Sequence, residues 1–401
     1  MKLLVSAYAC EPNKGSEPAV GWNWAHALLR RGHEVHVITR SNNRTGIERE
    51  LRGRNPAPRF VYYDLPRWAR FWKRWPGGVY LYYLLWQIGA YRFVKKLHLT
   101  EKFDLIHHVT FASYRQPSLM GALGVPFIFG PVGGGETMPA NLRHGIPFSG
   151  HIAEAVRNLG STLIPYDPLM RLTFSCAQTI ACTTSQTLAR IPRRFRIKCI
   201  VQPTIGIDKA EIDSARETSQ ILPQFLFVGR LIYWKGLHLA LRALAEARQS
   251  IPDVKLKVIG DGSDRGWLKG VAQNAGVLDS VEWITAMPHS KIRREYEESL
   301  AFVFPSLHDS GGMVVLEALA AGVPVICLDL GGPGAIVTSS CGIVIETGRD
   351  SNESVVANLA KAMILLATNP DYRARLSAGS IARAKQMTWD AAAAALYSSL
   401  E

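Results

Sequence analysis

Short apolar runs of strand length alternate with helical patterns along most of this chain, and this alternation limits the folds open to it. In the first half the expected strands cover residues 2–8, 34–40, 59–65, 103–109, 126–132, 179–185 and 198–204. A helical pattern over residues 20–31 follows the first run and closes at Gly32. Because parallel strands are joined by crossover helices, the alternation favours a doubly wound parallel sheet.

The same pattern begins again at Pro223. Its expected strands cover residues 223–231, 254–262, 280–286, 300–306 and 323–328, and its expected helices cover 237–250, 265–275, 290–299 and 313–321. A chain of 401 residues can build two full cores. We therefore predict an α/β protein with a first domain over 1–207, a second over 208–385 and a final helix over 386–401. Two such domains facing each other would form a ligand-binding cleft.

The composition suits a soluble globular protein with an anionic partner. The net charge is +13, which fits nucleotide phosphates or anionic lipid, although simple solubility would also explain it. There is no basic tail and no zinc-ligand spacing, so we expect no nucleic acid partner and no metal. None of the six cysteines forms a C-x2-C pair, and the first fifteen residues resemble a strand and loop. We therefore expect reduced cysteines and a cytoplasmic location.

The segment from Trp68 to Lys102 is unusually rich in aromatic and basic residues. Between Gly77 and Val94 the only charged residue is Arg92. Aromatic residues flanked by cations are typical of a helix lying in a membrane interface. Two alternatives stay open, namely a core helix or lid with an aromatic face, and a short membrane span.

The stretch HDSGGMVVLEALAAG, from His308 to Gly322, places two carboxylates around a glycine pair. It follows an expected strand, so its loop should lie at the carboxyl end of a parallel sheet, where ligands bind. The glycines leave the backbone N–H groups of Gly312, Met313 and Val314 open to an anion at the start of a helix. Glu317 has apolar neighbours, and its carboxylate would either bind ligand hydroxyl groups or point to solvent.

Two further loops of the second half carry candidate ligand-binding residues. Arg230 and Lys235 follow an expected strand and could neutralise a diphosphate, or they could be solvated charges. The turn from Gly260 to Gly262 is a poor dinucleotide fingerprint, because its third glycine is misplaced.

Loops in the first half of the chain add further candidate ligand-binding residues. Gly15 and Ser16 precede a helix and could hold phosphate or form a simple N-cap loop. The glycines Gly133, Gly134 and Gly135, followed by Glu136, allow close backbone approach to a ligand or form a mobile turn. His107 and His108 end an expected strand, where either ring could be structural or could face a ligand.

Taken together, these motifs resemble the retaining family-4 glycosyltransferases over nearly the whole chain. The Glu-x7-Glu element of that family resembles Asp309 to Glu317, and its GR…KG element matches Gly229–Arg230 and Lys235–Gly236. Its GDG turn matches Gly260–Gly262, and its glycine loop after the first strand matches the region of Gly15. The closing MTWDAAAAALYSSL resembles the family's final helix, which crosses back onto the first domain.

The resemblance implies the GT-B fold, with two Rossmann-like domains facing a central cleft, and a role for each candidate. Arg230 and Lys235 would hold the donor diphosphate, aided by Gly15, Ser16 and the helix start at Gly312, Met313 and Val314. Glu317 would bind the ribose, with Gly260, Ile284, Met287 and Pro288 near the nucleoside. Asp309 and one of His107 and His108 would lie at the transferred sugar. The loop Gly133, Gly134, Gly135 and Glu136 would lie on the acceptor side.

The implied reaction moves a sugar, with retention, from a UDP- or GDP-linked donor to a hydroxyl group. The basic, aromatic segment from Trp68 to Lys102 suggests that this hydroxyl belongs to a lipid-linked or cell-surface glycan. The resemblance implies no separate cofactor and no metal. The composition of Trp68 to Lys102 adds contact with the inner face of the cell membrane as an open expectation. Asp309 departs from the family because the usual residue is a longer glutamate. A sugar-nucleotide epimerase of the same fold and a non-catalytic nucleotide-sugar-binding protein are the alternatives.

Overall fold

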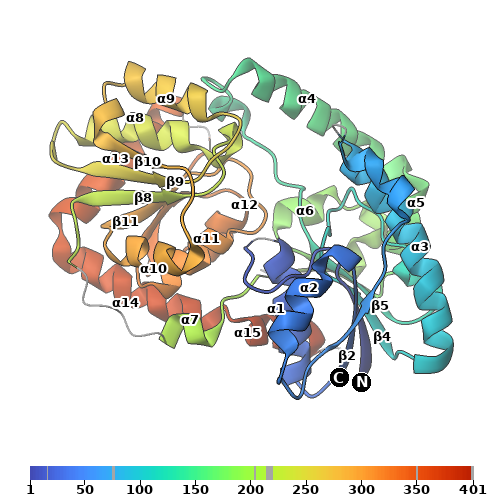
Figure 1. Cartoon of the computed structure of the whole chain (residues 1–401). Coiled ribbons are helices and arrows are strands. Elements are labelled where there is room, and N and C mark those ends of the chain that lie inside the picture. Colours follow the sequence, from blue (N-terminus) through green and yellow to red (C-terminus); the bar gives the residue numbers. More distant parts are fainter. Residues whose placement is uncertain (16, 75–76, 203–204, 214–219, 349–350, 399–401) are drawn as a thin grey trace. The chain divides into compact units, whose positions relative to one another are not determined.

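The computed structural model describes residues 1–15, 17–74, 77–202, 205–213, 220–348 and 351–398, with the side chains of 67, 72–74, 289 and 290 outside that description. The chain divides into two compact units (Figure 1). Unit 1 comprises Met1–Gly135, Leu159–Ile205 and Trp389–Glu401, and unit 2 comprises Glu136–Asn158 and Gly206–Thr388. Each unit is built on its own parallel sheet, which confirms the predicted α/β class.

The sheet of unit 1 has seven parallel strands in the order β3-β2-β1-β4-β5-β6-β7. They are β1 Lys2–Ser6, β2 Glu34–Thr39, β3 Arg59–Tyr62, β4 Leu105–His108, β5 Phe127–Val132, β6 Thr179–Cys182 and β7 Cys199–Val201. Its helices are α1 Glu17–Arg30, α2 Arg44–Leu51, α3 Gly78–Glu101, α5 Pro168–Cys176, α6 Ser185–Arg190 and α15 Trp389–Tyr397. Every strand run of this half was expected from the apolar pattern.

The sheet of unit 2 has six parallel strands in the order β10-β9-β8-β11-β12-β13. They are β8 Gln224–Val228, β9 Lys255–Ile259, β10 Val281–Ile284, β11 Ala301–Phe304, β12 Val325–Leu328 and β13 Gly342–Ile345. Its helices are α7 Lys209–Asp213, α8 Leu237–Ala247, α9 Arg265–Asn274, α10 His289–Glu297, α11 Met313–Ala320, α12 Gly331–Ile336, α13 Asn352–Thr368 and α14 Pro370–Gln386. The edge strand β13 was not expected from the sequence.

The two sheets share one topological feature that locates ligand sites. In each, the strand order reverses beside the first strand, between β1 and β4 in unit 1 and between β8 and β11 in unit 2. Loops that leave the carboxyl ends of strands on either side of such a reversal diverge and leave room for a ligand. The residues after β1, β4, β8 and β11 are therefore the candidates for ligand binding and catalysis.

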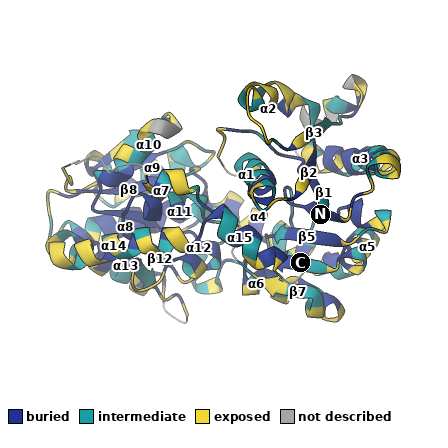
Figure 2. Cartoon of the chain, turned by 90° about the horizontal axis from the view of Figure 1, so that it is seen from below, coloured by how far each residue is buried: buried dark blue, intermediate teal, exposed yellow. Residues whose placement is uncertain are grey.

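The central strands are buried on both faces, as their continuous apolar runs require. All five residues of β8 and all four of β11 are buried, and Figure 2 shows the central strands in the colour of buried residues. Helices rich in alanine and leucine cover them; α8, for example, buries eight of its eleven residues. Such cores hold the strand ends, and hence the loops, in fixed positions.

Helix α3 buries an aromatic face in the core of unit 1. Tyr82, Tyr83 and Trp86 are fully buried, and the indole N–H of Trp86 donates to the carbonyl of Tyr63 at 3.0 Å. This is the arrangement of the core-helix alternative, while Trp68 and Tyr80 before and at its start are exposed. Residues 75–76 and the side chains of 72–74 lie outside the described part of this segment. Among the described residues, no helix is long and apolar enough to cross a membrane.

Two segments cross between the units. The expected first domain ran continuously to residue 207, whereas residues 136–158 group with unit 2. The last segment, Trp389–Glu401, groups with unit 1, where Arg30 Nε of α1 lies 2.8 Å from the carboxylate of Asp390 in α15. Helix α4 (Phe148–Leu163) contains the junction between residues 158 and 159. Each unit is therefore assembled from separated pieces of chain.

Candidate functional site

The clearest candidate site lies at the carboxyl ends of β8 and β11 in unit 2. The ammonium group of Lys235, in the turn after β8, forms an ion pair with the carboxylate of Asp309, in the loop after β11. Both side chains are largely shielded, and Lys235 Nζ also lies 5.1 Å from the centre of the Phe304 ring. The fold thus joins two residues that the sequence marked separately. Arg230, nearby in sequence, is an exposed residue.

Close backbone contact between these two loops explains the glycine after Lys235. Gly236 has φ +73°, and a Cβ atom there would collide with the carbonyl oxygen of Pro305. The N–H of Leu307 donates to the carbonyl of Trp234 at 2.8 Å, and the Ser306 hydroxyl donates to the same carbonyl at 3.1 Å. These bonds hold the backbone of the two loops, and hence the positions of the Lys235 and Asp309 side chains.

The GDG turn packs backbone to backbone on the loop that carries Arg230. Cβ atoms at Gly260 and Gly262 would collide with the carbonyl oxygens of Gly229 and Leu231. The N–H of Leu231 donates to the carbonyl of Asp261, and the N–H of Asp264 donates back to Leu231, both at 3.0 Å. The structure therefore gives these glycines a packing role in the Arg230 loop. Whether Gly260 also contacts a nucleoside stays a prediction.

Helix α11 presents its N-terminus and Glu317 from the loop after β11. Gly312 is its left-handed N-cap residue, with φ +91°, so the first N–H groups of the helix, including those of Met313 and Val314, lack partners within it. Glu317 is half-buried, and the hydroxyl of Tyr296 in α10 lies 3.5 Å from its carboxylate. Burial, together with the charge of Glu317, raises the pKa of Tyr296, which keeps its phenol protonated as a donor.

The remaining predicted nucleoside residues lie beside the GDG turn. Ile284 ends β10, and its carbonyl accepts a hydrogen bond from the N–H of Gly260 at 2.8 Å. Ile284 and Met287 are half-buried, and Pro288, just before α10, is exposed. This places the segment at the same edge of the sheet as Arg230. A contact of these residues with a nucleoside stays a prediction.

A buried cluster missed by the sequence reasoning holds the residue before Asp309. Nε2 of His308 lies 2.8 Å from the Glu154 carboxylate, and the Tyr233 hydroxyl donates to the same oxygen at 3.0 Å. The imidazole also stacks on Trp234, with ring centres 5.5 Å apart. Burial opposes ionisation of Glu154, but His308, Arg157 and Tyr233 together hold its pKa below the usual value. An ionised Glu154 accepts from His308, so Nε2 carries the proton.

Ser310, the residue after Asp309, is held by Glu136, which belongs to the same segment, residues 136–158, as Glu154. The Ser310 hydroxyl donates to the buried carboxylate of Glu136. On the other side, Gly331 and Gly332 of α12 lie so close to the loop that Cβ atoms there would strike the carbonyls of Asp309 and Gly311. Asp309 is therefore bracketed by fixed neighbours. The sequence offered only the GGPG run after β12 as a sign of this close packing.

In unit 1, the His107 ring is buried and has a protein partner at each nitrogen. Its Nε2 lies 2.9 Å from the carbonyl oxygen of Gly130, and its Nδ1 lies 3.0 Å from the hydroxyl of Tyr397 in α15. The ring also packs edge to face with Trp24. Burial lowers the pKa of His107 to about 3. These contacts favour the structural alternative for this residue.

His108 is equally buried, on the opposite face of the sheet. Its Nδ1 lies 3.1 Å from the Ser6 hydroxyl and 3.2 Å from the Ser118 hydroxyl, and Nε2 lies 3.3 Å from the Tyr83 hydroxyl. Burial lowers the pKa of His108 to about 3, so the ring is neutral at physiological pH. Its polar partners again favour a structural role.

The glycine loop after β5 is well anchored. The N–H of Gly135 donates to the Thr187 hydroxyl at 3.1 Å, and a Cβ atom at Gly135 would collide with the backbone of Thr187. Gly134 has φ +90°, and Gly133 forms a bridge with Ser113 in the loop after β4. Gly15 is exposed with open space around it. Ser16 lies outside the described residues.

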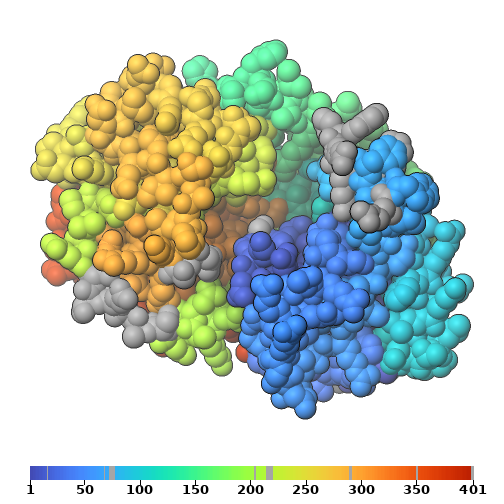
Figure 3. All heavy atoms as spheres, viewed as in Figure 1, coloured from blue at the N-terminus to red at the C-terminus, as the bar shows by residue number. Residues whose placement is uncertain are grey.

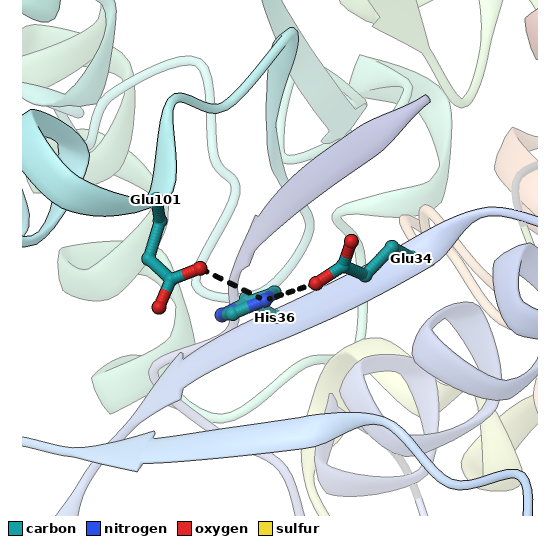
Figure 4. Close-up of side chains that lie close together, drawn as sticks. All are labelled: Glu34, His36 and Glu101. Carbon is teal, nitrogen blue, oxygen red and sulfur yellow. Dashed lines mark hydrogen bonds and ion pairs between the residues drawn. The ribbon is translucent and has the colours of Figure 1, made fainter.

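One group of potential metal ligands lies at the other end of the unit 1 sheet. Glu34, His36 and Glu101 bring one ligand atom each within 4.8 Å of one another (Figure 4). The ammonium group of Lys2 already pairs with both carboxylates, and the Arg59 guanidinium lies 3.5 Å from Glu34. Since Lys2 and Glu34 begin their strands, the cluster is at the amino ends, away from the ligand edge. It is best described as an ion-pair network.

Two family models match adjacent parts of the chain. Residues 15–201 match the model described as "Glycosyl transferase 4-like domain", and residues 208–383 match the model described as "Glycosyl transferases group 1". Among solved structures, the chain resembles WaaG, described as a glycosyltransferase involved in lipopolysaccharide biosynthesis. The TM-score is 0.62 at 17% identity, covering 98% of both chains. At this identity the likeness shows the fold.

Curated relatives match the chain over different lengths. The chain is 32% identical over 166 residues to a glycogen synthase of Mycobacterium tuberculosis, covering 41% of this chain and 39% of that protein. It is 22% identical over 388 residues to a phosphatidylinositol N-acetylglucosaminyltransferase component of Arabidopsis thaliana, covering 92% of this chain and 76% of that protein. The chain thus spans about two fifths of the length of the glycogen synthase it matches.

Proposed function

Because the chain belongs to the glycosyl transferases group 1 and has the GT-B fold, we propose that it moves a sugar, with retention, from a nucleotide-diphosphate donor to a hydroxyl acceptor. One observation carries the proposal. The Lys235–Asp309 pair brings a cation and a carboxylate together at adjacent strand ends, in the loop that leads into α11. The cation and the N-terminus of the helix would bind the negative charge of a diphosphate, and the carboxylate would accept hydrogen bonds from sugar hydroxyl groups.

Each part of the donor would meet a matching group. Lys235, Arg230 and the first N–H groups of α11 would bind the diphosphate, so donor binding would replace part of the Lys235–Asp309 pair. Asp309 would then accept from sugar hydroxyl groups, and Glu317 would accept from the ribose. The Tyr296 hydroxyl lies 3.2 Å from the carbonyl of Val314 and 3.5 Å from the Glu317 carboxylate, and it would help to orient that carboxylate. Because Asp309 is shorter than a glutamate, the sugar would sit closer to the loop backbone.

The reaction breaks the bond between the anomeric carbon and the diphosphate oxygen. Negative charge grows on the departing diphosphate, and Lys235, Arg230 and the α11 dipole would stabilise it. The acceptor oxygen forms its new bond on the same face, and its proton passes to a diphosphate oxygen. This route uses no protein nucleophile, and we propose no metal or further cofactor, since protein cations and N–H groups would neutralise the charge.

We further propose a lipid-linked or cell-surface glycan as acceptor and a cytoplasmic, membrane-peripheral site of action. The names of two similar proteins support this choice, one acting on phosphatidylinositol and one in lipopolysaccharide biosynthesis. The excess of positive charge supports it as well.

The test is a panel of UDP- and GDP-linked sugars with the purified chain, followed by release of the free nucleoside diphosphate. We expect slow release from one donor, which names base and sugar together. Glu317→Ala should abolish it, whereas Glu353→Ala, at an exposed position of the same unit, should not. Thermal stabilisation by UDP or GDP alone reports the nucleotide site separately.

Each other outcome is decisive. Stabilisation without release, even with glycolipid acceptors present, would indicate a nucleotide-sugar-binding protein. Conversion of the donor sugar into its epimer without acceptor would indicate an epimerase. Neither stabilisation nor release with any donor would overturn the proposed donor site.

A further inference from the structure

Helix α4 has its polar and apolar faces reversed relative to an ordinary surface helix. The side turned to the protein carries Gly150, Glu154 and Ser161, which are buried, and Arg157, which is half-buried. The side turned to solvent carries five large apolar residues with exposed fractions between 51 and 79%, namely Phe148, Ile152, Val156, Leu159 and Leu163. A surface helix normally buries its apolar side, so this one exposes what packing would otherwise cover.

The five exposed residues form one stripe. Their spacing of four, four, three and four residues keeps them on a single face of a helix. Sixteen residues of helix extend about 24 Å, and the exposed Tyr166 follows directly after the stripe. The apolar face of α4, meaning these five residues with Tyr166, is visible in part among the green surface atoms of Figure 3. A continuous apolar surface of this length on a water-facing helix marks an interaction site.

The polar side of α4 is fixed to the protein, which leaves the stripe pointing outward. Glu154 accepts from His308 and Tyr233, and a Cβ atom at Gly150 would already touch the Tyr233 ring at 3.2 Å. Turning the helix to bury its apolar side would break these bonds and expose a buried carboxylate without partners. The helix is therefore held in the reversed orientation by its charged residues.

The charges around the stripe select the partner. Residues 136–176 contain three carboxylates, and each is already engaged: Glu136 with Ser310, Glu154 with His308, and Asp167 as the N-cap of α5. The exposed basic side chains of this segment are His144, His151 and Arg171, which flank or lie within the helix. The surface therefore offers apolar groups and cations, with no exposed carboxylate.

We propose that the apolar face of α4 docks on an anionic lipid bilayer, with the stripe in the acyl boundary and the flanking cations at the head groups. Amphipathic helices bind such interfaces by this combination of apolar area and positive charge. A second copy of the chain fits less well, because pairing two α4 faces would bring cations together without carboxylates to match them. The proposal concerns a surface separate from the donor site and does not depend on the transfer reaction.

The test is co-sedimentation of the full chain with vesicles of equal parts phosphatidylglycerol and phosphatidylcholine, compared with phosphatidylcholine alone. We expect binding to the anionic vesicles that falls with added salt. The variant Ile152→Ser/Val156→Ser/Leu159→Ser should weaken it at least about tenfold. The control Leu99→Ser/Ile221→Ser/Leu365→Ser removes three exposed apolar side chains elsewhere and should bind as the wild type does.

Three results would overturn the proposal. The first is unchanged vesicle binding in the α4 variant, especially if Trp68→Ser/Tyr80→Ser abolishes it, which would assign the membrane contact to the start of α3. The second is equal binding to neutral vesicles. The third is a dimer in sedimentation velocity that the α4 variant dissociates. Unchanged thermal unfolding of the α4 variant shows that it is folded, because the substituted residues are exposed.

Discussion

The Glu154 carboxylate lies 2.8 Å from Nε2 of His308, although the two residues are 154 positions apart in the chain. His308 immediately precedes Asp309, and Glu136, from the same separated segment, holds Ser310 on the other side. Residues 136–158 therefore set the position of the Asp309 loop through both of its neighbours. A change in this segment can alter donor chemistry without touching the donor.

Glu154→Gln should test this link. The amide keeps the shape but accepts more weakly from His308 and Tyr233 and cannot pair with Arg157, so we expect a loss of about 1–3 kcal/mol in unfolding free energy. If the segment positions Asp309, the donor KM should also rise several-fold or kcat should fall. Urea unfolding and donor kinetics measure the two effects.

The control for Glu154 is Glu298→Gln, which weakens an ion pair with Arg294 in the same unit. It should change neither kinetic constant. If Glu154→Gln lowers stability but leaves the donor KM and kcat unchanged, Glu154 has a structural role only.

Lys235→Ala should lower donor turnover by about 10²–10³-fold, because the leaving diphosphate would lose its shielded cation. Lys235→Arg should restore part of that rate, since a guanidinium supplies the charge with a different reach. Initial rates with the identified donor measure both. Full activity in Lys235→Ala would remove this residue from the diphosphate site.

Tyr397→Phe should destabilise unit 1 without abolishing turnover. It removes the hydroxyl that lies 3.0 Å from Nδ1 of His107 and leaves a buried nitrogen unpaired, at a cost of about 1–3 kcal/mol. A lowered melting temperature with turnover within about threefold of wild type is expected. A large loss of turnover in a variant that is still folded would instead indicate that His107 acts at the transferred sugar.

Acid should weaken the ion-pair network around Lys2. His36 lowers the pKa of Glu34, and Lys2 lowers that of Glu101. Each carboxylate therefore contributes stability that is complete above its unfolded-state pKa, near 4.5, and is lost as pH falls through the lower folded value. Urea midpoints between pH 7 and pH 3 should fall more steeply for wild type than for Glu101→Gln. Parallel curves would contradict this assignment.

The sequence predicted both sheets because their strands are continuous apolar runs, which a fully buried parallel strand requires. It also marked Lys235 and Asp309 separately, and the parallel topology placed both at one edge. The edge strand β13 was missed because it is short and half of its residues are only partly buried. No local pattern connects Glu154 with His308, since only the fold brings such distant residues together. For the same reason, the buried partners of His107 could not be predicted.

The return of the chain to unit 1 at Trp389 has a consequence for how the molecule is made. The pieces of unit 2 are all synthesised once the ribosome has passed Thr388, whereas unit 1 still lacks α15, which supplies the Tyr397 hydroxyl beside His107. The unit whose first strand emerges first is thus the last to be finished. During translation His107 in its sheet must wait for the hydroxyl partner that the closing helix supplies.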